Sequence, residues 1–163
     1  MVNVLSLATA AAAASIAIVD HTQTFAVDLT NTQCAAFAPV EQFTFHSTPA
    51  ERLKLNAVAG SQNQFQIQHI QCGTTVTWAG STSGAKTVRS QPVSLHGSDT
   101  VFTITPVDAS SSTGPFRLLE SVSGTALTAW AVDSTHDSKS APITFETSRD
   151  ADPRQMFYFT NSL

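Results

Sequence analysis

One pattern of alternating apolar and polar residues recurs along the chain at a spacing of 50 residues. Its three copies are Phe43-Thr-Phe45, Val93-Ser-Leu95 and Ile143-Thr-Phe145. Alternation of this kind in residues that favour β-structure predicts half-buried strands. A fixed period of this length predicts an architecture built from repeats.

Other strands recur around this one. The segments that open at Phe65 and Phe116 run in step, and each turns at a glycine, Gly73 or Gly124. Phe25-Ala-Val27, followed by Cys34 and Phe37, is a looser third copy. A final strand recurs as Leu53-Lys-Leu55, Phe102-Thr-Ile104 and Phe157-Tyr-Phe159. No amphipathic helix of three turns follows residue 20, so the sequence predicts an all-β domain of twelve strands in three pseudo-threefold repeats, at about 22–56, 65–106 and 116–160.

This strand order resembles the β-trefoil. The third repeat is most similar to the ricin B-chain type, through Gly124-Thr-Ala-Leu127-Thr, Pro142-Ile143-Thr-Phe145 and Gln155-Met-Phe157. The last of these is similar to the Gln-x-Trp motif of that family, with Phe in place of Trp. The corresponding segments Glu51-Arg52-Leu53 and Thr100-Val101-Phe102 lack the Gln. Fungal cysteine-protease inhibitors and Kunitz-type inhibitors share the architecture without the motif, so the fold alone does not give the function.

The N-terminal segment has the features of a targeting sequence. Residues 1–19 carry no charged side chain, and the apolar stretch from Leu5 to Val19 is too short to span a bilayer. Small residues at Ser15 and Ala17 suit a signal peptidase. We therefore expect a secretory signal peptide at 1–17, a mature domain at 18–163, an extracellular location and no membrane anchor. The alternative is an N-terminal helix that is retained and buried.

Cys34 and Cys72 are the two cysteines of the chain. In an exported protein two thiols usually pair, which predicts a Cys34–Cys72 disulfide. The alternative is two buried free thiols. Neither residue lies in a Cys-x-x-Cys pattern, so metal binding through sulfur is not expected.

The ricin-type resemblance implies a sugar site made of an Asp after the second strand, a stacking aromatic ring and a polar pair. The third repeat offers such a set in Trp130, Asp133, His136 and Asp137. The alternative is that Trp130 and Trp78 are packing residues at matching places in two repeats.

A metal site is a weaker hypothesis. His46, His96 and Glu146 follow the recurring strand at the same place in each copy, and two imidazoles with one carboxylate suit a transition metal. Each lies next to an inward-facing residue and should point outward. Three solvated surface side chains are the alternative.

Function is predicted by exclusion. The sequence has no nucleophile elbow, no zinc-protease motif and no phosphate-binding loop, so we expect neither catalysis nor a cofactor. A net charge of −4 with scattered Lys and Arg disfavours nucleic acid. The prediction is a secreted, fungal-type binding module for a protein partner, as an accessory subunit of an extracellular enzyme such as a laccase-type oxidase, or as a protease inhibitor. The alternative is a lectin that binds a glycan through the third repeat.

Overall fold

A computed structural model of the chain describes residues 15–35, 38–77, 86, 87, 89–92, 101–132 and 139–161, with only the backbone given for 86–92. Within these residues the chain forms thirteen strands of one sheet, linked by turns and short 3-10 helices. The strands are β1 (Ile16–Asp20), β2 (Phe25–Leu29), β3 (Val40–Thr44), β4 (Leu53–Ala57), β5 (Gln64–His69), β6 (Thr74–Thr77), β7 (Lys86–Thr87), β8 (Arg89–Pro92), β9 (Val101–Pro106), β10 (Phe116–Glu120), β11 (Ala126–Ala129), β12 (Ser140–Glu146) and β13 (Phe157–Asn161). The 3-10 helices are η1 (Thr30–Thr32), η2 (Pro49–Glu51) and η6 (Pro153–Gln155).

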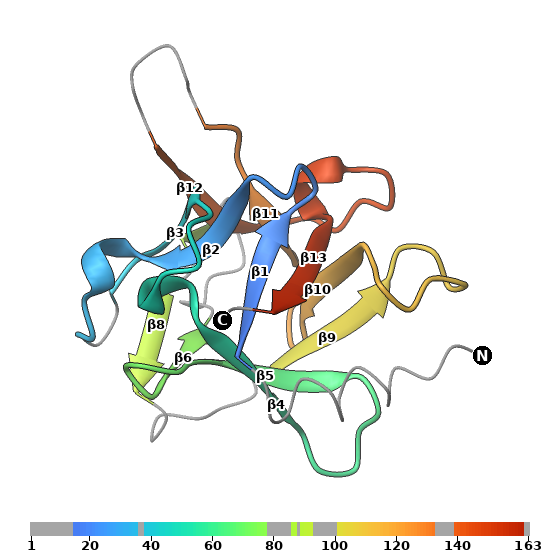
Figure 1. Cartoon of the computed structure of the whole chain (residues 1–163). Coiled ribbons are helices and arrows are strands. Elements are labelled where there is room, and N and C mark those ends of the chain that lie inside the picture. Colours follow the sequence, from blue (N-terminus) through green and yellow to red (C-terminus); the bar gives the residue numbers. More distant parts are fainter. Residues whose placement is uncertain are drawn as a thin grey trace.

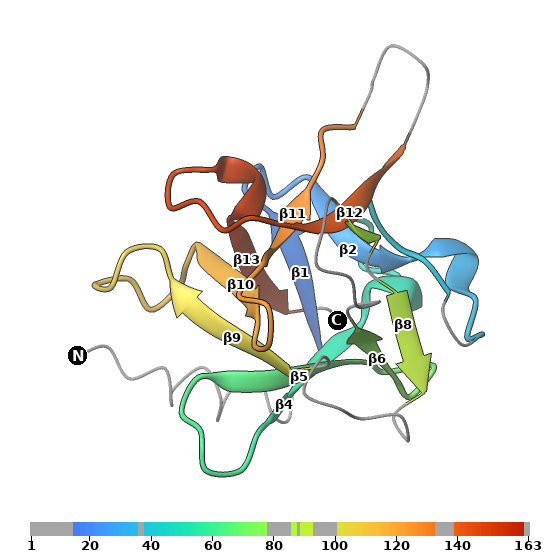
Figure 2. The same ribbon diagram turned by 180° about the vertical axis from the view of Figure 1, so that it is seen from behind.

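Six of the strands close into a barrel. β1 pairs with β4 and β13, β5 pairs with β4 and β9, and β10 pairs with β9 and β13, all antiparallel. These strands lie side by side in both views of Figures 1 and 2. Because the ring is closed, each of the six strands has a neighbouring strand on both sides, and none is an edge strand.

The other strands form one hairpin per repeat. β2 pairs with β3, β6 with β8, and β11 with β12. β12 also pairs with β3 and with the two-residue strand β7, which joins the hairpins to one another. The predicted all-β class with four strands per repeat is confirmed, as β1–β4, β5–β9 and β10–β13, with β7 as an addition to the twelve.

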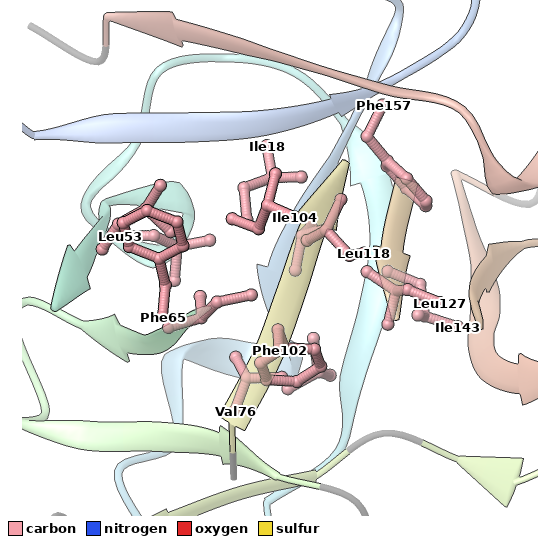
Figure 3. Packing of buried hydrophobic residues seen from close by; sticks show 14 of the residues in the cluster. Ile18, Leu53, Phe65, Val76, Phe102, Ile104, Leu118, Leu127, Ile143 and Phe157 are labelled. Carbon is pink, nitrogen blue, oxygen red and sulfur yellow. The ribbon is translucent and has the colours of Figure 1, made fainter. Parts of the chain in front are cut away.

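Large apolar side chains from equivalent positions fill the barrel. The inward positions of the first strands are Ile18, Ile67 and Leu118, and those of the last strands are Leu53, Phe102 and Phe157, all 2% exposed or less. Figure 3 shows several of them packed in one cluster with Phe65, Ile104 and Leu127. The predicted recurrence of the final strand is therefore confirmed, and so is the predicted match between the segments at Phe65 and Phe116. Equivalent residues of the three repeats pack together in one core.

The first repeat begins earlier than the sequence predicts. Ile16 and Ala17 belong to β1, where they pair with Asn161 and Thr160 of β13. Both are buried, at 4% and 0% exposure, and Ile16 also pairs with Leu53. The predicted boundary after Ala17 divides this strand. Residues 1–14 lie outside the described residues, so the signal peptide itself stays a prediction.

A chain that starts at Ile18 is expected to be less stable than one that starts at Ser15. It loses the buried Ile16 side chain and two residue pairs to β13. Burial of an isoleucine contributes about 2 kcal/mol, so urea unfolding of the two chains should differ by at least about that amount. Equal unfolding midpoints would show that β1 is stable without its first two residues.

The alignment predicted for the first repeat is wrong by one strand. Phe25-Ala-Val27 lies in β2, and Ile16-x-Ile18 takes the place that Phe65-x-Ile67 has in the second repeat. In β3 the buried residues are Val40 and Gln42, whereas Phe43 is half-buried. The prediction was out of phase because one residue of slip moves every side chain of a strand to the other face.

In the third repeat, the inward positions predicted from the recurring pattern are correct. Ile143 and Phe145 are almost fully buried, as predicted. Phe45 instead packs on a small second cluster that includes Val19 and Ala26. Val93 and Leu95 lie outside the described residues.

Candidate functional site

A pocket of about 390 Å³ opens in the first repeat. Its walls come from β2, η1, β3, η2 and the turn that follows β5. The residues used below are Asp28, Asn31, Glu41, Phe43, His46 and Gln71. We call this the repeat-1 pocket.

Asp28 is the most unusual residue of the repeat-1 pocket. It lies on β2 opposite Glu41 of β3, and it is only 8% exposed. Its carboxyl group makes no hydrogen bond to any other residue that the structure describes. Burial raises its pKa from 3.8 to about 7, and the nearby charges of Glu51 and Glu41 add to the effect. Asp28 is thus a buried acid that has no hydrogen-bond partner among the described residues and that lines a pocket.

The third repeat shows what this position looks like when it is satisfied. Ala26 and Ala126 pair with equivalent residues of the first strands, so Asp28 corresponds to Thr128. Thr128 Oγ1 donates to the carbonyl of Ala126 at 3.0 Å and accepts from Gln155 Nε2 at 3.2 Å. Each polar atom therefore has a partner inside the protein.

In the first repeat an acid replaces that glutamine. Glu51 ends η2 as Gln155 ends η6, and its two carboxylate oxygens accept from the backbone N–H groups of His46 at 2.9 Å and Thr48 at 2.6 Å. A carboxylate has no N–H to offer. Asp28 therefore faces a second acid at the place where Thr128 faces an amide, which explains its missing donor.

Glu51→Gln is expected to lower the pKa of Asp28 from about 7 toward its ordinary value. The change removes a like charge and supplies an amide donor, as Gln155 does in the third repeat. A carboxyl-carbon NMR titration measures the shift. Glu120→Gln is the matched control, because Glu120 is also fully buried and accepts backbone N–H groups but belongs to another repeat. An unchanged Asp28 titration in Glu51→Gln would contradict this account.

A disulfide holds two walls of the repeat-1 pocket together. Cys34 and Cys72 are bonded, which confirms the predicted pair. Asn31 lies shortly before Cys34, and Gln71 immediately precedes Cys72. The bond thereby brings a residue of the second repeat into a pocket of the first.

His69 supports the same wall from below. Its Nδ1 accepts from the backbone N–H of Cys72 at 3.2 Å, and its Nε2 lies 3.0 Å from the carbonyl oxygen of Ala50 in η2. An accepting Nδ1 requires a neutral ring, in which Nε2–H donates to Ala50. Burial lowers the pKa of His69, which is consistent with the neutral form. The turn after β5 is thus fixed to η2, and both contribute residues to the pocket.

The predicted third-repeat site is only partly described. Trp130 is half-buried, its Nε1 donates to Thr144 Oγ1 at 2.7 Å, and Arg154 lies over the ring at 4.6 Å from its centre. One face of the indole is therefore already covered. Asp133, His136, Asp137 and also Trp78 lie outside the described residues. A sugar site at Trp130 stays a prediction.

The predicted equivalence of His46, His96 and Glu146 is wrong for the two residues that can be compared. Glu146 pairs with Ala126, and in the first repeat Ala26 pairs with Phe43, so Glu146 corresponds to Phe43 and not to His46. Glu146 accepts from Thr144 Oγ1, whereas His46 is exposed beside the repeat-1 pocket. His96 is not described. Among the described residues, no group of three or more His, Cys, Asp or Glu is arranged to hold a metal ion.

Solved structures with the same strand arrangement identify the fold. The designed threefold-symmetric protein ThreeFoil superposes with a TM-score of 0.73 at 18% identity, over 90% of this chain and 98% of that one. The BEL β-trefoil superposes with a TM-score of 0.70 at 14% identity, over 91% and 93% of the two chains. The fold is a β-trefoil.

A further neighbour of the same fold is an agglutinin. The Rhizoctonia solani agglutinin superposes with a TM-score of 0.70 at 13% identity, over 91% of this chain and 95% of that one. No family model and no curated protein sequence matches the chain. At these identities the β-trefoil architecture is shared, and the neighbours' ligands are not thereby assigned to this chain.

Two further observations bear on location. No helix in the described part of the chain is long and apolar enough to cross a membrane. The disulfide is consistent with an oxidising compartment such as the cell exterior. Secretion and the fungal type remain predictions from the sequence.

Apart from His46, which the sequence suggested as a metal ligand, the residues of the repeat-1 pocket were not predicted as a site. The predicted alignment placed Phe25 in a first strand, so Asp28 was not recognised as a residue of the second strand. Aligning Ile16-x-Ile18 with Phe65-x-Ile67 puts Asp28 in line with Thr77 and Thr128. An acid among threonines at one position of a threefold repeat is the signal that would have found it.

Proposed function

We propose that this β-trefoil is a non-catalytic binding module that holds a saccharide in the repeat-1 pocket. The observation that carries the proposal is the buried carboxyl group of Asp28, which no described residue pairs with, in the same pocket as the half-buried ring of Phe43. A buried polar group without a partner is costly to the fold, and such groups concentrate at sites that bind ligands.

The pocket has the chemistry that a sugar ring needs. Its volume lies within the range of small-molecule sites. The ring of Phe43 can pack against the C–H face of a sugar, while Asp28, Asn31 and Gln71 offer acceptors and donors for hydroxyl groups. The ricin-type resemblance implies an Asp just after the second strand and a stacking aromatic ring, whereas Asp28 lies within the second strand, β2, with Phe43 in the same pocket. The agglutinin among the neighbours supports this choice.

Protein binding is the second candidate. Ile70 and Val122 are 42% and 59% exposed, and they are the large apolar side chains exposed in the described part of the chain. They lie in the turns after β5 and β10. Scattered exposed apolar residues are common on soluble proteins, so the pocket carries the stronger argument. An accessory subunit would co-elute with a larger protein in gel filtration of the native source.

The saccharide proposal is tested on a glycan array followed by calorimetry with the best ligand. Phe43→Ala is expected to weaken binding about tenfold, because it removes the stacking surface at a cost of about 1 kcal/mol or more. Trp130→Ala tests the predicted third-repeat site in the same assay, and the affinity stays unchanged if the repeat-1 pocket holds the saccharide. Binding to no glycan, or loss of binding in Trp130→Ala alone, would contradict the repeat-1 site.

A further inference from the structure

The charge of the repeat-1 pocket is one-sided. Asp28 and Glu41 line it directly, on neighbouring positions of β2 and β3. Glu51 of η2 does not line the pocket, but its charge is close enough to repel that of Asp28. None of the described residues that line the pocket is a lysine or an arginine, and the exposed His46 is the lining residue that can become positively charged. Acids on two walls of the pocket therefore face no lysine or arginine among its described lining residues.

We propose that the repeat-1 pocket selects a saccharide unit that carries a free primary amine, and that it rejects acidic sugars. The ammonium group would lie between Asp28 and Glu41. This inference rests on the proposed saccharide function and names its substrate class.

The buried carboxyl group of Asp28 is the reason why we expect an amine, and not only a hydroxyl group, to bind there. Asp28 is more than nine-tenths buried and lines the pocket, and no described residue donates to its carboxyl group. An ammonium group brings three N–H donors and a positive charge, whereas a sugar hydroxyl brings one neutral donor. Hydrogen bonds between ionised partners are about twice as strong as neutral ones.

The same arrangement disfavours an acidic sugar. A fourth carboxylate beside Asp28, Glu41 and Glu51 adds like-charge repulsion in a partly buried space. The third repeat lacks this preference, because Thr128 and Gln155 satisfy one another there. Of the first and third repeats, whose equivalent residues are described, only the first is therefore expected to prefer the amine.

Calorimetry at pH 7 with three matched probes tests the inference. The probes are a β-1,4-linked glucosamine trimer, the corresponding N-acetylglucosamine trimer and a galacturonate trimer. The glucosamine trimer is expected to bind about tenfold more tightly than its N-acetylated form, and the galacturonate trimer should not bind measurably. The first two probes differ only in the group at the nitrogen, so their ratio measures the preference for a free ammonium over an acetamide, and the acid variants below show how much of it depends on charge.

Variants locate the preference. Asp28→Asn and Glu41→Gln should each bring the two glucosamine affinities to within about twofold of one another. Asp108→Asn, which removes an acid from the exposed turn after β9, should leave the tenfold ratio in place. Glu41 is only half-buried, so its variant keeps the test valid if Asp28→Asn changes the fold.

The outcomes separate the two proposals. Equal affinity for the amine and its acetylated form, a preference that persists in both pocket variants, or no binding of any of the three probes overturns the amine inference. If neutral glycans on the array still bind in a way that depends on Phe43, the saccharide function stands without it. If no glycan binds at all, the saccharide function falls as well.

Discussion

Asp28→Asn is expected to stabilise the protein above pH 7, by up to about 4 kcal/mol, and to have no such effect near pH 4. The folded-state pKa of Asp28 is about 7 and its ordinary value is 3.8. Between these values the unfolded chain loses the proton while the folded chain keeps it. The free energy of unfolding therefore falls as the pH rises from about 4 to 7, and it stays low above 7. Asparagine cannot ionise, so the variant lacks this fall.

Urea unfolding at several pH values measures the effect. Wild type and Asp28→Asn should have similar unfolding free energies near pH 4 and diverge as the pH rises to about 7. Asp108→Asn is the control, because Asp108 is exposed and hydrogen bonds to Ser110 lower its pKa instead of raising it. A pH profile for Asp28→Asn that parallels the wild type would show that Asp28 is ionised in the folded protein at little cost.

Removal of the disulfide is the second change with a large expected effect. The double variant Cys34→Ser, Cys72→Ser frees two residues that are 38 apart in the sequence. Loop-closure entropy for a loop of this size gives a loss of about 3 to 4 kcal/mol in the free energy of unfolding. The variant should also bind saccharide more weakly, because Gln71 and the segment around Asn31 are no longer held at the mouth of the repeat-1 pocket.

The stability loss and the binding loss can be separated. Affinity is measured at low temperature without denaturant, where far-UV circular dichroism shows whether the double variant is folded. Wild type with a reductant should reproduce the double variant, and Asp108→Asn, in the exposed turn after β9, should keep wild-type affinity under the same conditions. A folded double variant with wild-type affinity would show that His69 alone holds the turn after β5 in place.

The second and third repeats were the ones that could be predicted well. Phe65 and Phe116 lie at the start of the first strands of these repeats, and Phe102 and Phe157 lie at the start of the last strands. Apolar and polar residues alternate without interruption in these segments, which is why they could be predicted. The first repeat failed where the alternation is interrupted by polar residues, as at Gln42, and where β1 resembled the end of a signal peptide.

The Gln-x-Trp motif marks a structural position that the first repeat also has, although its residue there is not Gln. Glu51 was taken as a departure from the motif, yet it occupies the place of Gln155 and makes comparable bonds to the backbone. Glu differs from Gln by one donor, and that donor is what Asp28 lacks. A departure from the motif is therefore what makes the first repeat different from the third.

The sequence by itself determined the all-β class, the threefold order of strands and the pairing of Cys34 with Cys72, because these follow from local periodicity and from residue counts. The tertiary structure alone decided where the candidate site lies. Asp28 is unusual only because β2, β3 and η2 bring it against Glu41 and Glu51 and remove it from water. Burial and the absence of a donor arise from segments that are distant in the chain, and no local pattern records them.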